Sequence, residues 1–205
     1  MPTQTFYNLP EEKQKRITDA IITELSIHPY EHINIQNIIK DAKIPRGSFY
    51  QYFKSKDDIF DFFYTHLKQI KFAFWGSLFT EPLDISFLER IKMIYIKGYE
   101  FNKAYPKLVE AAKKISQSPT FLNDDKYQEG IKQSIEMYKH FIIADQEKNL
   151  IRKDLDPQFL ATMIIEFMNK VTLEQLVKDT IDYQQISEKA QQLIEIIGKG
   201  IQTHV

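Results

Sequence analysis

Apolar residues recur every three or four positions along most of this chain, which is the spacing of one buried face of an α-helix. The first such stretch covers residues 11–28 and carries Ile17, Ile21 and Leu25 on a common face. Pro29 follows directly and cannot continue a helix. The pattern therefore predicts an amphipathic helix that ends in a loop near residue 29.

Two shorter helices and one long helix are predicted next. Asn34 is a good N-cap residue for a brief helix, and Pro45 suits the first turn of another, where its missing N–H is not needed. Ser55 followed three residues later by Asp58 is typical of a capped helix start. We therefore expect a long helix over residues 55–79.

Five further helical patterns occupy the rest of the chain, and no segment alternates convincingly enough to predict a β-strand. They begin near residues 87, 106, 127, 157 and 186. The sequence thus predicts an all-α protein of about nine helices. The last two patterns are apolar over more than one face, unlike a helix that packs on one side only.

Composition narrows the possible functions. The chain has 205 residues, 43% of them hydrophobic and 27% charged, with a formal net charge of -1 and no cysteine. Disulfides and cysteine chemistry are excluded, and any binding to DNA must rely on a local basic patch. We found no signal peptide or membrane span and expect a cytoplasmic protein with no membrane partner.

The segment "IPRGSFYQYFKSK", residues 44–56, combines aromatic and cationic side chains. On a helix that starts at Pro45, Phe49 and Phe53 share one face, while Arg46 and Tyr50 point nearly the opposite way. A short helix of this kind, preceded by another short helix and a tight turn, is the layout of a helix-turn-helix.

The polar face of this helix has the chemistry of a DNA reader. Arg46 can pair with guanine and Gln51 with adenine, and Gly47 lets the backbone approach the groove. Residues 40–56 contain five basic residues and one acidic residue, a local charge of +4. An ordinary solvated surface helix is the alternative. Three further side chains suit phosphate contacts, namely Tyr50, Tyr52 and Lys56.

The run "INIQNIIKDAKIPRGSFYQYFKSKDDIF" closely resembles the DNA-binding signature of the TetR/AcrR family of bacterial transcriptional regulators, and "RITDAIITEL" resembles its first helix. The resemblance implies a helix-turn-helix DNA-binding domain over residues 1–56 and a helical effector-binding and dimerisation domain over residues 57–205, with the helix 55–79 as connector. It also implies a homodimer that binds a partly palindromic double-stranded DNA operator and represses transcription until a small-molecule effector binds.

By position, this resemblance implies a set of DNA-contacting residues on the two short helices. They are Gln36, Asn37, Arg46, Gly47, Ser48, Tyr50, Gln51, Tyr52 and Lys56. Ser48 could equally cap or pack, and Asn37 could satisfy its own helix terminus. The chain departs from the family at Lys43, where glycine is usual. If φ is positive there, lysine costs about 1 kcal/mol relative to glycine.

The wide apolar stripes of the last two helices predict packing on a second subunit as well as on the same chain. Burial within a single-chain core is the alternative. The residues that we expect at the dimer interface are Phe159, Met163, Phe167, Leu193, Ile197 and Ile201.

Many aromatic residues lie in the middle of the chain and could line an apolar effector pocket with a few hydroxyl groups. Simple core packing is the alternative for each ring. The candidates are Trp75, Tyr95, Tyr99, Tyr138 and Phe141. Gly98 within a predicted helix suggests a close helix crossing or space for a ligand.

Catalytic and cofactor motifs are not found. Pro29 breaks the helix that would align His28 with His32 for a metal ion, so we expect neither an enzyme nor a cofactor. Three hypotheses remain open: a ligand-responsive repressor, a helical small-molecule carrier or enzyme that does not bind DNA, and a constitutive DNA-binding protein without an effector.

Overall fold

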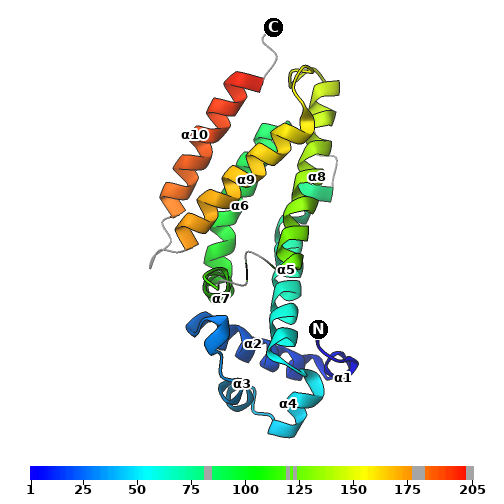
Figure 1. Cartoon of the computed structure of the whole chain (residues 1–205), viewed down its shortest axis with the longest axis vertical. Helices are drawn as coiled ribbons and strands as arrows, with labels where there is room; N and C mark the ends of the chain where they lie inside the picture. The colour runs from blue at the N-terminus through cyan, green and yellow to red at the C-terminus, as the bar shows by residue number, and fades with distance from the viewer. Residues whose placement is uncertain (81–84, 119–120, 122–123, 177–182, 202–205) are drawn as a thin grey trace. The chain divides into compact units, whose positions relative to one another are not determined.

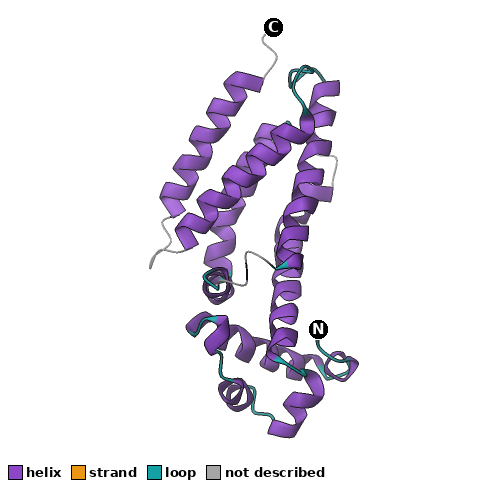
Figure 2. Ribbon diagram, in the orientation of Figure 1, coloured by secondary structure: helices purple, strands orange, loops and turns teal. Residues whose placement is uncertain are grey.

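A computed structural model describes residues 1–80, 85–118, 121, 124–176 and 183–201. Over these residues the chain forms ten α-helices and a 3-10 turn, with no β-strand (Figure 2). The all-α prediction is confirmed, and each of the nine expected helices is present. The additional helix is a single turn near the N-terminus.

The helices fall into an early and a late group along the chain. The early group is α1 (Gln4–Tyr7), α2 (Glu11–Ile27), η1 (Tyr30–His32, the 3-10 turn), α3 (Ile35–Asp41), α4 (Arg46–Tyr52) and α5 (Lys56–Thr80). The late group is α6 (Phe87–Ala104), α7 (Pro106–Ser116), α8 (Asp125–Glu147), α9 (Pro157–Leu176) and α10 (Tyr183–Ile201).

The chain divides into two compact units. The first unit consists of Met1–Phe74 and Ala104–Ser118, and the second consists of Trp75–Lys103 and Pro119–Val205. Helix α7 belongs to the first unit because it packs on α2, although its sequence position lies in the expected second domain. Helix α5 begins in the first unit and its last residues belong to the second.

The first unit has a continuous apolar core. Phe49 and Phe53 of the helix-turn-helix segment are fully buried and stack with ring centroids 5.4 Å apart. Phe6 of α1 packs against Phe53 at 5.3 Å, so the extra N-terminal turn covers this core. The face that sequence periodicity assigned to the interior is therefore the buried one.

Side-chain caps fix three helix starts, one of which is the start at Asn34 that the sequence predicted. The Asn34 side chain accepts a hydrogen bond from the backbone N–H of Gln36 at 2.9 Å. Asp124 and Asp156 cap α8 and α9 by accepting backbone N–H groups of those helices. Each cap satisfies a donor that the first helical turn leaves without a partner.

The turn between α3 and α4 is a Schellman motif. The N–H of Lys43 donates to the carbonyl of Lys40 at 3.1 Å, and the N–H of Ile44 donates to the carbonyl of Ile39 at 3.2 Å. This motif requires a left-handed residue after the helix, and Lys43 has φ of 51°. The positive φ considered from the sequence is therefore present, with lysine where glycine fits best.

In the second unit, α9 lies beside both α8 and α10 (Figure 1). The apolar core of the second unit joins α6, α8, α9 and α10 through residues such as Ile91, Ile142, Ile164 and Ile197. A buried carboxylate, Asp145 on α8, accepts the N–H of Phe87 at the start of α6 at 2.6 Å. This bond fixes the beginning of α6 against α8.

Candidate nucleic-acid interface

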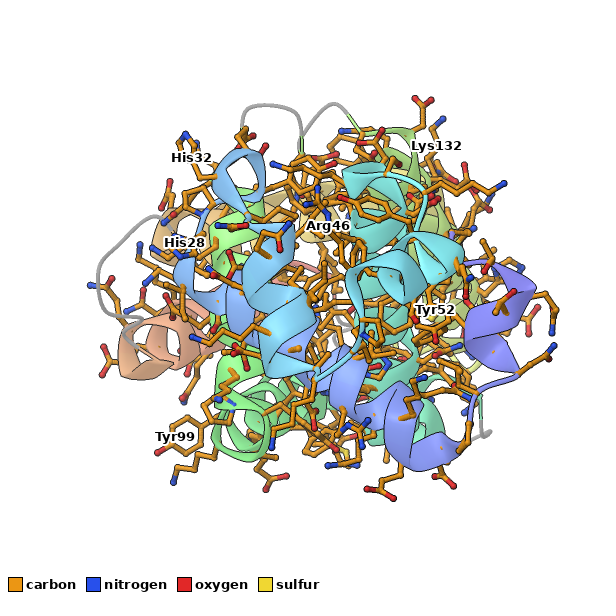
Figure 3. All side chains as sticks on the ribbon, turned by 90° about the horizontal axis from the view of Figure 1, so that it is seen from below. His28, His32, Arg46, Tyr52, Tyr99 and Lys132 are labelled. Carbon is orange, nitrogen blue, oxygen red and sulfur yellow. The ribbon has the colours of Figure 1, made fainter. Side chains whose placement is uncertain are left out.

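Helix α4 presents an exposed polar face. Arg46, Gly47 and Gln51 are exposed, and Tyr50 is 44% exposed although its ring touches Phe49 edge-on at 5.6 Å. Figure 3 shows this unit from below, with Arg46 between the ribbons of α3 and α4. The side chains that suit base contacts are therefore accessible to a large partner.

The N-terminal segment holds the end of α4 in place. The backbone N–H of Thr3 donates to the carbonyl of Tyr52 at 2.9 Å, and the Thr3 hydroxyl donates to the carbonyl of Gln51 at 2.6 Å. These bonds satisfy carbonyl groups that the last helical turn leaves open. Together with the buried Phe49 and Phe53, they make α4 a rigid support for its outer face.

Helix α3 is anchored by a buried glutamate of α2. The carboxylate of Glu24 accepts the backbone N–H of Asn34 at 2.7 Å and the side-chain amide of Asn37 at 3.1 Å. Asn37 thus has a structural partner in α2, and not at its own helix terminus, which was the alternative considered for this residue. Gln36, one position earlier, is exposed.

Tyr52 does not lie on the exposed face. It is only 3% exposed, its ring packs near Phe6 at 6.3 Å, and the ammonium group of Lys13 lies 5.6 Å from its ring centroid. A phosphate contact requires an accessible hydroxyl, so its burial argues against the role expected from the sequence. We remove Tyr52 from the proposed contact set.

Lys56 and Ser48 are half-buried. The Lys56 ammonium group, at the start of α5, donates to the carbonyl of Glu31 in η1 at 3.3 Å. Beside it, the Tyr30 hydroxyl donates to Asp57 at 2.6 Å, and burial together with Asp57 raises the pKa of Tyr30. Lys56 is therefore held at the junction of η1 and α5.

The charge around the turn is unneutralised. Lys40, Lys43, Arg46 and Lys54 are all exposed, and none of them forms an ion pair with any residue that the structure describes. An exposed cluster of one sign on a chain of net charge -1 attracts an anionic partner locally.

The residues expected at a dimer interface divide into two groups. Phe159, Met163 and Phe167 are exposed on one face of α9, four residues apart, and Phe159 is 66% exposed. Ile197 and Ile201 are buried in the core of the same chain and Leu193 packs against that core, whereas Ile196 of α10 is 71% exposed. Ile197 and Ile201 therefore have no exposed surface of their own to contact a second subunit.

The residues expected around an effector also divide. Tyr95, Tyr138 and Phe141 join the core of the second unit. Trp75 stacks on Phe101 at 4.8 Å and donates its ring N–H to the carbonyl of Ile94 at 3.3 Å. Tyr99 is 48% exposed with the Lys103 ammonium over its ring, so it lies away from this core.

Glu24 and Arg90 are two of the buried charged residues that were missed from the sequence. Each lies within the apolar stripe of its helix, since Glu24 follows Ile21 by three positions and Arg90 follows Phe87 by three positions. A charged residue on a buried face is the signal that could have identified them. A Cβ at Gly98 would meet no atom within 4 Å, so a close helix crossing does not explain that glycine.

Neither metal ligands nor membrane spans alter this picture. The described residues contain no group of three or more His, Cys, Asp or Glu side chains arranged to hold a metal ion. Among the same residues, no helix has the length and apolar character needed to cross a bilayer.

Helices α3 and α4 and the tight turn between them form a helix-turn-helix whose second helix has an exposed outer face. Residues 17–61 match the family described as bacterial regulatory proteins, tetR family. Residues 17–61 therefore carry the helix-turn-helix segment of that family, which confirms the TetR/AcrR resemblance of the sequence. No curated protein matches the chain.

Solved structures share the fold over 91–100% of this chain. A TetR family transcriptional regulator from Chloroflexus aurantiacus J-10-FL has a TM-score of 0.64 at 23% identity and covers 100% of both chains. The fatty acid degradation regulator FadR from Bacillus halodurans has a TM-score of 0.71 at 19% identity, covering 91% of this chain and 96% of its own. FadR from Bacillus subtilis, solved with stearoyl-CoA, has a TM-score of 0.71 at 17% identity, covering 91% and 98%.

Proposed function

We propose that this protein is a homodimeric, ligand-responsive transcriptional regulator, and specifically a repressor that leaves a partly palindromic DNA operator when a small apolar or aromatic effector binds. The N-terminal helix-turn-helix domain, residues 1–56, would bind DNA. The remaining helices, residues 57–205, would bind the effector and the second subunit, with α5 as the connection.

The DNA-binding part of this proposal rests on one observation, the exposure of the outer face of α4. Arg46 and Gln51 are exposed on a helix whose opposite side is fully buried, so their orientation toward a partner is fixed before binding. Guanidinium and amide groups can form paired hydrogen bonds with guanine and adenine edges. Unpaired cations at Lys40, Lys43 and Lys54 supply the sequence-independent attraction to phosphate.

The proposed dimer rests on α9 and α10. Phe159, Met163 and Phe167 form an exposed apolar stripe on α9 and Ile196 adds an exposed isoleucine on α10. Exposed apolar side chains at helical spacing suit packing against the same surface of a second subunit. Two reading helices held by one dimer would match operator half-sites about 34 Å apart along B-DNA.

Ligand control is proposed from the second unit and from named relatives. FadR from Bacillus subtilis has been solved with stearoyl-CoA, and a gamma-butyrolactone receptor shares the fold with a TM-score of 0.65 at 14% identity. An effector can release DNA only if it binds the two conformations of the regulator with different affinity. Helix α5, which has residues in both units, would transmit that preference.

The DNA-binding proposal is tested by selecting bound fragments from random duplex DNA and repeating the binding by gel shift. We expect a two-fold symmetric site bound by wild type and weakened by Arg46→Ala. The matched control is Arg16→Ala, which removes an exposed arginine of α2 paired with Glu12 at 3.8 Å. Failure to bind any duplex at low ionic strength would refute the proposal and favour a helical carrier or enzyme.

A constitutive DNA-binding protein is the other alternative. It would bind the selected duplex with the same affinity whatever small molecule is added. The ligand-responsive proposal instead requires at least one effector that changes this affinity.

A further inference from the structure

Arg90 of α6 is a buried cation with few partners. It is 5% exposed, and its guanidinium lies 4.2 Å from the centroid of the Phe141 ring. It donates to the carbonyl of Leu78, its one side-chain hydrogen bond to the part of the chain that the structure describes. A guanidinium has five N–H donors, so most of its capacity is not used by the protein.

Tyr138 of α8 carries a second unused polar group. It is 8% exposed and its ring meets Phe87 edge-on at 5.5 Å, but its hydroxyl forms no hydrogen bond to the described residues. Buried hydroxyl groups are nearly always hydrogen-bonded in folded proteins. The described residues therefore supply no hydrogen-bond partner for this buried hydroxyl, which leaves it available to a ligand.

Tyr95 of α6 is a third polar side chain in the core of the second unit, after Arg90 and Tyr138. Its hydroxyl donates to the thioether sulfur of Met168 at 2.8 Å, and a thioether is a weak acceptor. Burial raises the pKa of Tyr138 to about 12, while the positive charge of Arg90 acts in the opposite direction. Burial also raises the pKa of Tyr95, with a further contribution from Tyr138. The ring contacts bring Arg90 and Tyr138 together, because Phe141, under the Arg90 guanidinium, is three residues from Tyr138 on α8, and Phe87, against the Tyr138 ring, is three residues from Arg90 on α6.

Asp145 is the acidic group that faces this cluster. It is buried and accepts the backbone N–H of Phe87 at 2.6 Å, and among the described residues it forms no ion pair with Arg90. Burial lowers the pKa of Arg90, and the charge of Asp145 acts in the opposite direction. An arginine side chain stays cationic in proteins, and the N–H groups that Arg90 does not use within the described residues remain available to an acceptor.

The surroundings restrict what such an acceptor can be. The apolar core of the second unit, which includes Ile91, Ile142 and Ile164, also contains Tyr138 and packs against Tyr95 and Phe141. A ligand that satisfies the polar groups must present acceptor oxygens at one end and bury hydrocarbon or a ring elsewhere. A carboxylate fits best, because its two oxygens match the planar guanidinium.

We propose that the effector is an amphipathic carboxylate whose charged end binds Arg90 and the Tyr138 hydroxyl, and whose apolar body packs among α6, α8 and α9. This inference rests on the proposed ligand-responsive function and names the chemical class of its ligand. It also assigns a role to Arg90, which sequence periodicity alone did not single out.

Tyr138→Phe tests the proposal, because it removes the hydroxyl and keeps the ring. Tyr127→Phe is the matched control on the same helix, since the Tyr127 hydroxyl already donates to Asn169 at 2.9 Å. Isothermal titration with hexanoate, decanoate and palmitate, and with the corresponding alcohols, compares charged and neutral ligands of equal length. We expect wild type to bind at least one carboxylate more tightly than its alcohol, with affinity about 10-fold lower in Tyr138→Phe and unchanged in Tyr127→Phe.

Stability without ligand gives a second readout. Tyr138→Phe loses no hydrogen bond and should unfold at the same or a higher urea concentration than wild type, whereas Tyr127→Phe should unfold at a lower one. Arg90→Met should abolish the preference for carboxylate over alcohol; if that variant does not fold, Arg90→Lys and Tyr138→Phe carry the test.

Equal binding of alcohol and carboxylate, no binding of any of the three carboxylates, or wild-type affinity in Tyr138→Phe would each overturn the inference. Gel shift of the same preparations separates this result from the wider proposal. Loss of carboxylate selectivity with intact DNA binding refutes only the ligand class, whereas absence of DNA binding refutes the regulator itself.

Discussion

Replacing Lys43 by glycine should stabilise the protein. Lys43 occupies the left-handed position of the Schellman motif with φ of 51°. A non-glycine residue there costs about 1–2 kcal/mol, while glycine adds about 0.5–1 kcal/mol of chain entropy to be lost on folding. We therefore expect Lys43→Gly to raise the free energy of unfolding by about 0.5–1 kcal/mol.

Urea denaturation followed by circular dichroism measures this change. Lys43→Ala is the first control, because it removes the same side-chain charge but keeps the unfavourable φ. Asn149→Gly is the second: Asn149 has φ of 57° in an equivalent cap of α8, with its N–H donating to Gln146 at 3.1 Å, and asparagine tolerates this conformation.

The three variants should therefore differ in their free energy of unfolding. Lys43→Gly should exceed Lys43→Ala in stability, and Asn149→Gly should change little. If Lys43→Gly proves no more stable than Lys43→Ala, the strain assigned to this turn is absent and the argument from φ is refuted.

Three other predictions concern DNA binding, assembly and pH. Arg46→Ala or Gln51→Ala should relax preference at particular base pairs by about 1–3 kcal/mol, whereas Lys56→Ala should weaken all sequences and lower the salt slope by about one; equal behaviour in gel shifts over a salt series would contradict this division. Phe159→Glu should yield monomers by analytical ultracentrifugation. The control Ile96→Glu changes an exposed apolar residue of α6 and should remain dimeric. A dimeric Phe159→Glu protein would exclude the α9 face as the interface. Burial lowers the pKa of His66, which stacks on Phe62 at 5.7 Å, so its contribution to stability is present above its ordinary pKa of 6.5 and is lost as pH falls through the lower folded value. The melting temperature of His66→Leu should accordingly fall less than that of wild type between pH 7 and pH 5, and parallel curves would show that His66 does not contribute.

Local patterns were sufficient for the helices and the helix-turn-helix. The helical spacing of apolar residues and the capping role of residues such as Asn34 and Asp156 depend only on neighbours a few positions away, and these are visible in the sequence. The short α1 was not predicted because it forms one turn and is stabilised by contacts between Phe6 and residues near position 53.

Site residues were harder to predict because their exposure depends on distant contacts. Tyr52 looks equivalent to Tyr50 in the sequence, but α1 and Lys13 cover it. Ile197 and Ile196 are adjacent, yet one faces the core and the other is exposed. The partners of Arg90 and Glu24 come from other helices, which helical periodicity cannot reveal.

Gly47 is exposed in the first turn of α4, and a methyl group added there would touch nothing within 4 Å. Alanine would favour the helix by up to about 1 kcal/mol, and the isolated subunit offers no steric reason against it. The bare backbone at this position matters only to something that comes very near from outside. A stabilised Gly47→Ala protein with impaired operator affinity would thus measure how closely the duplex approaches the main chain of α4.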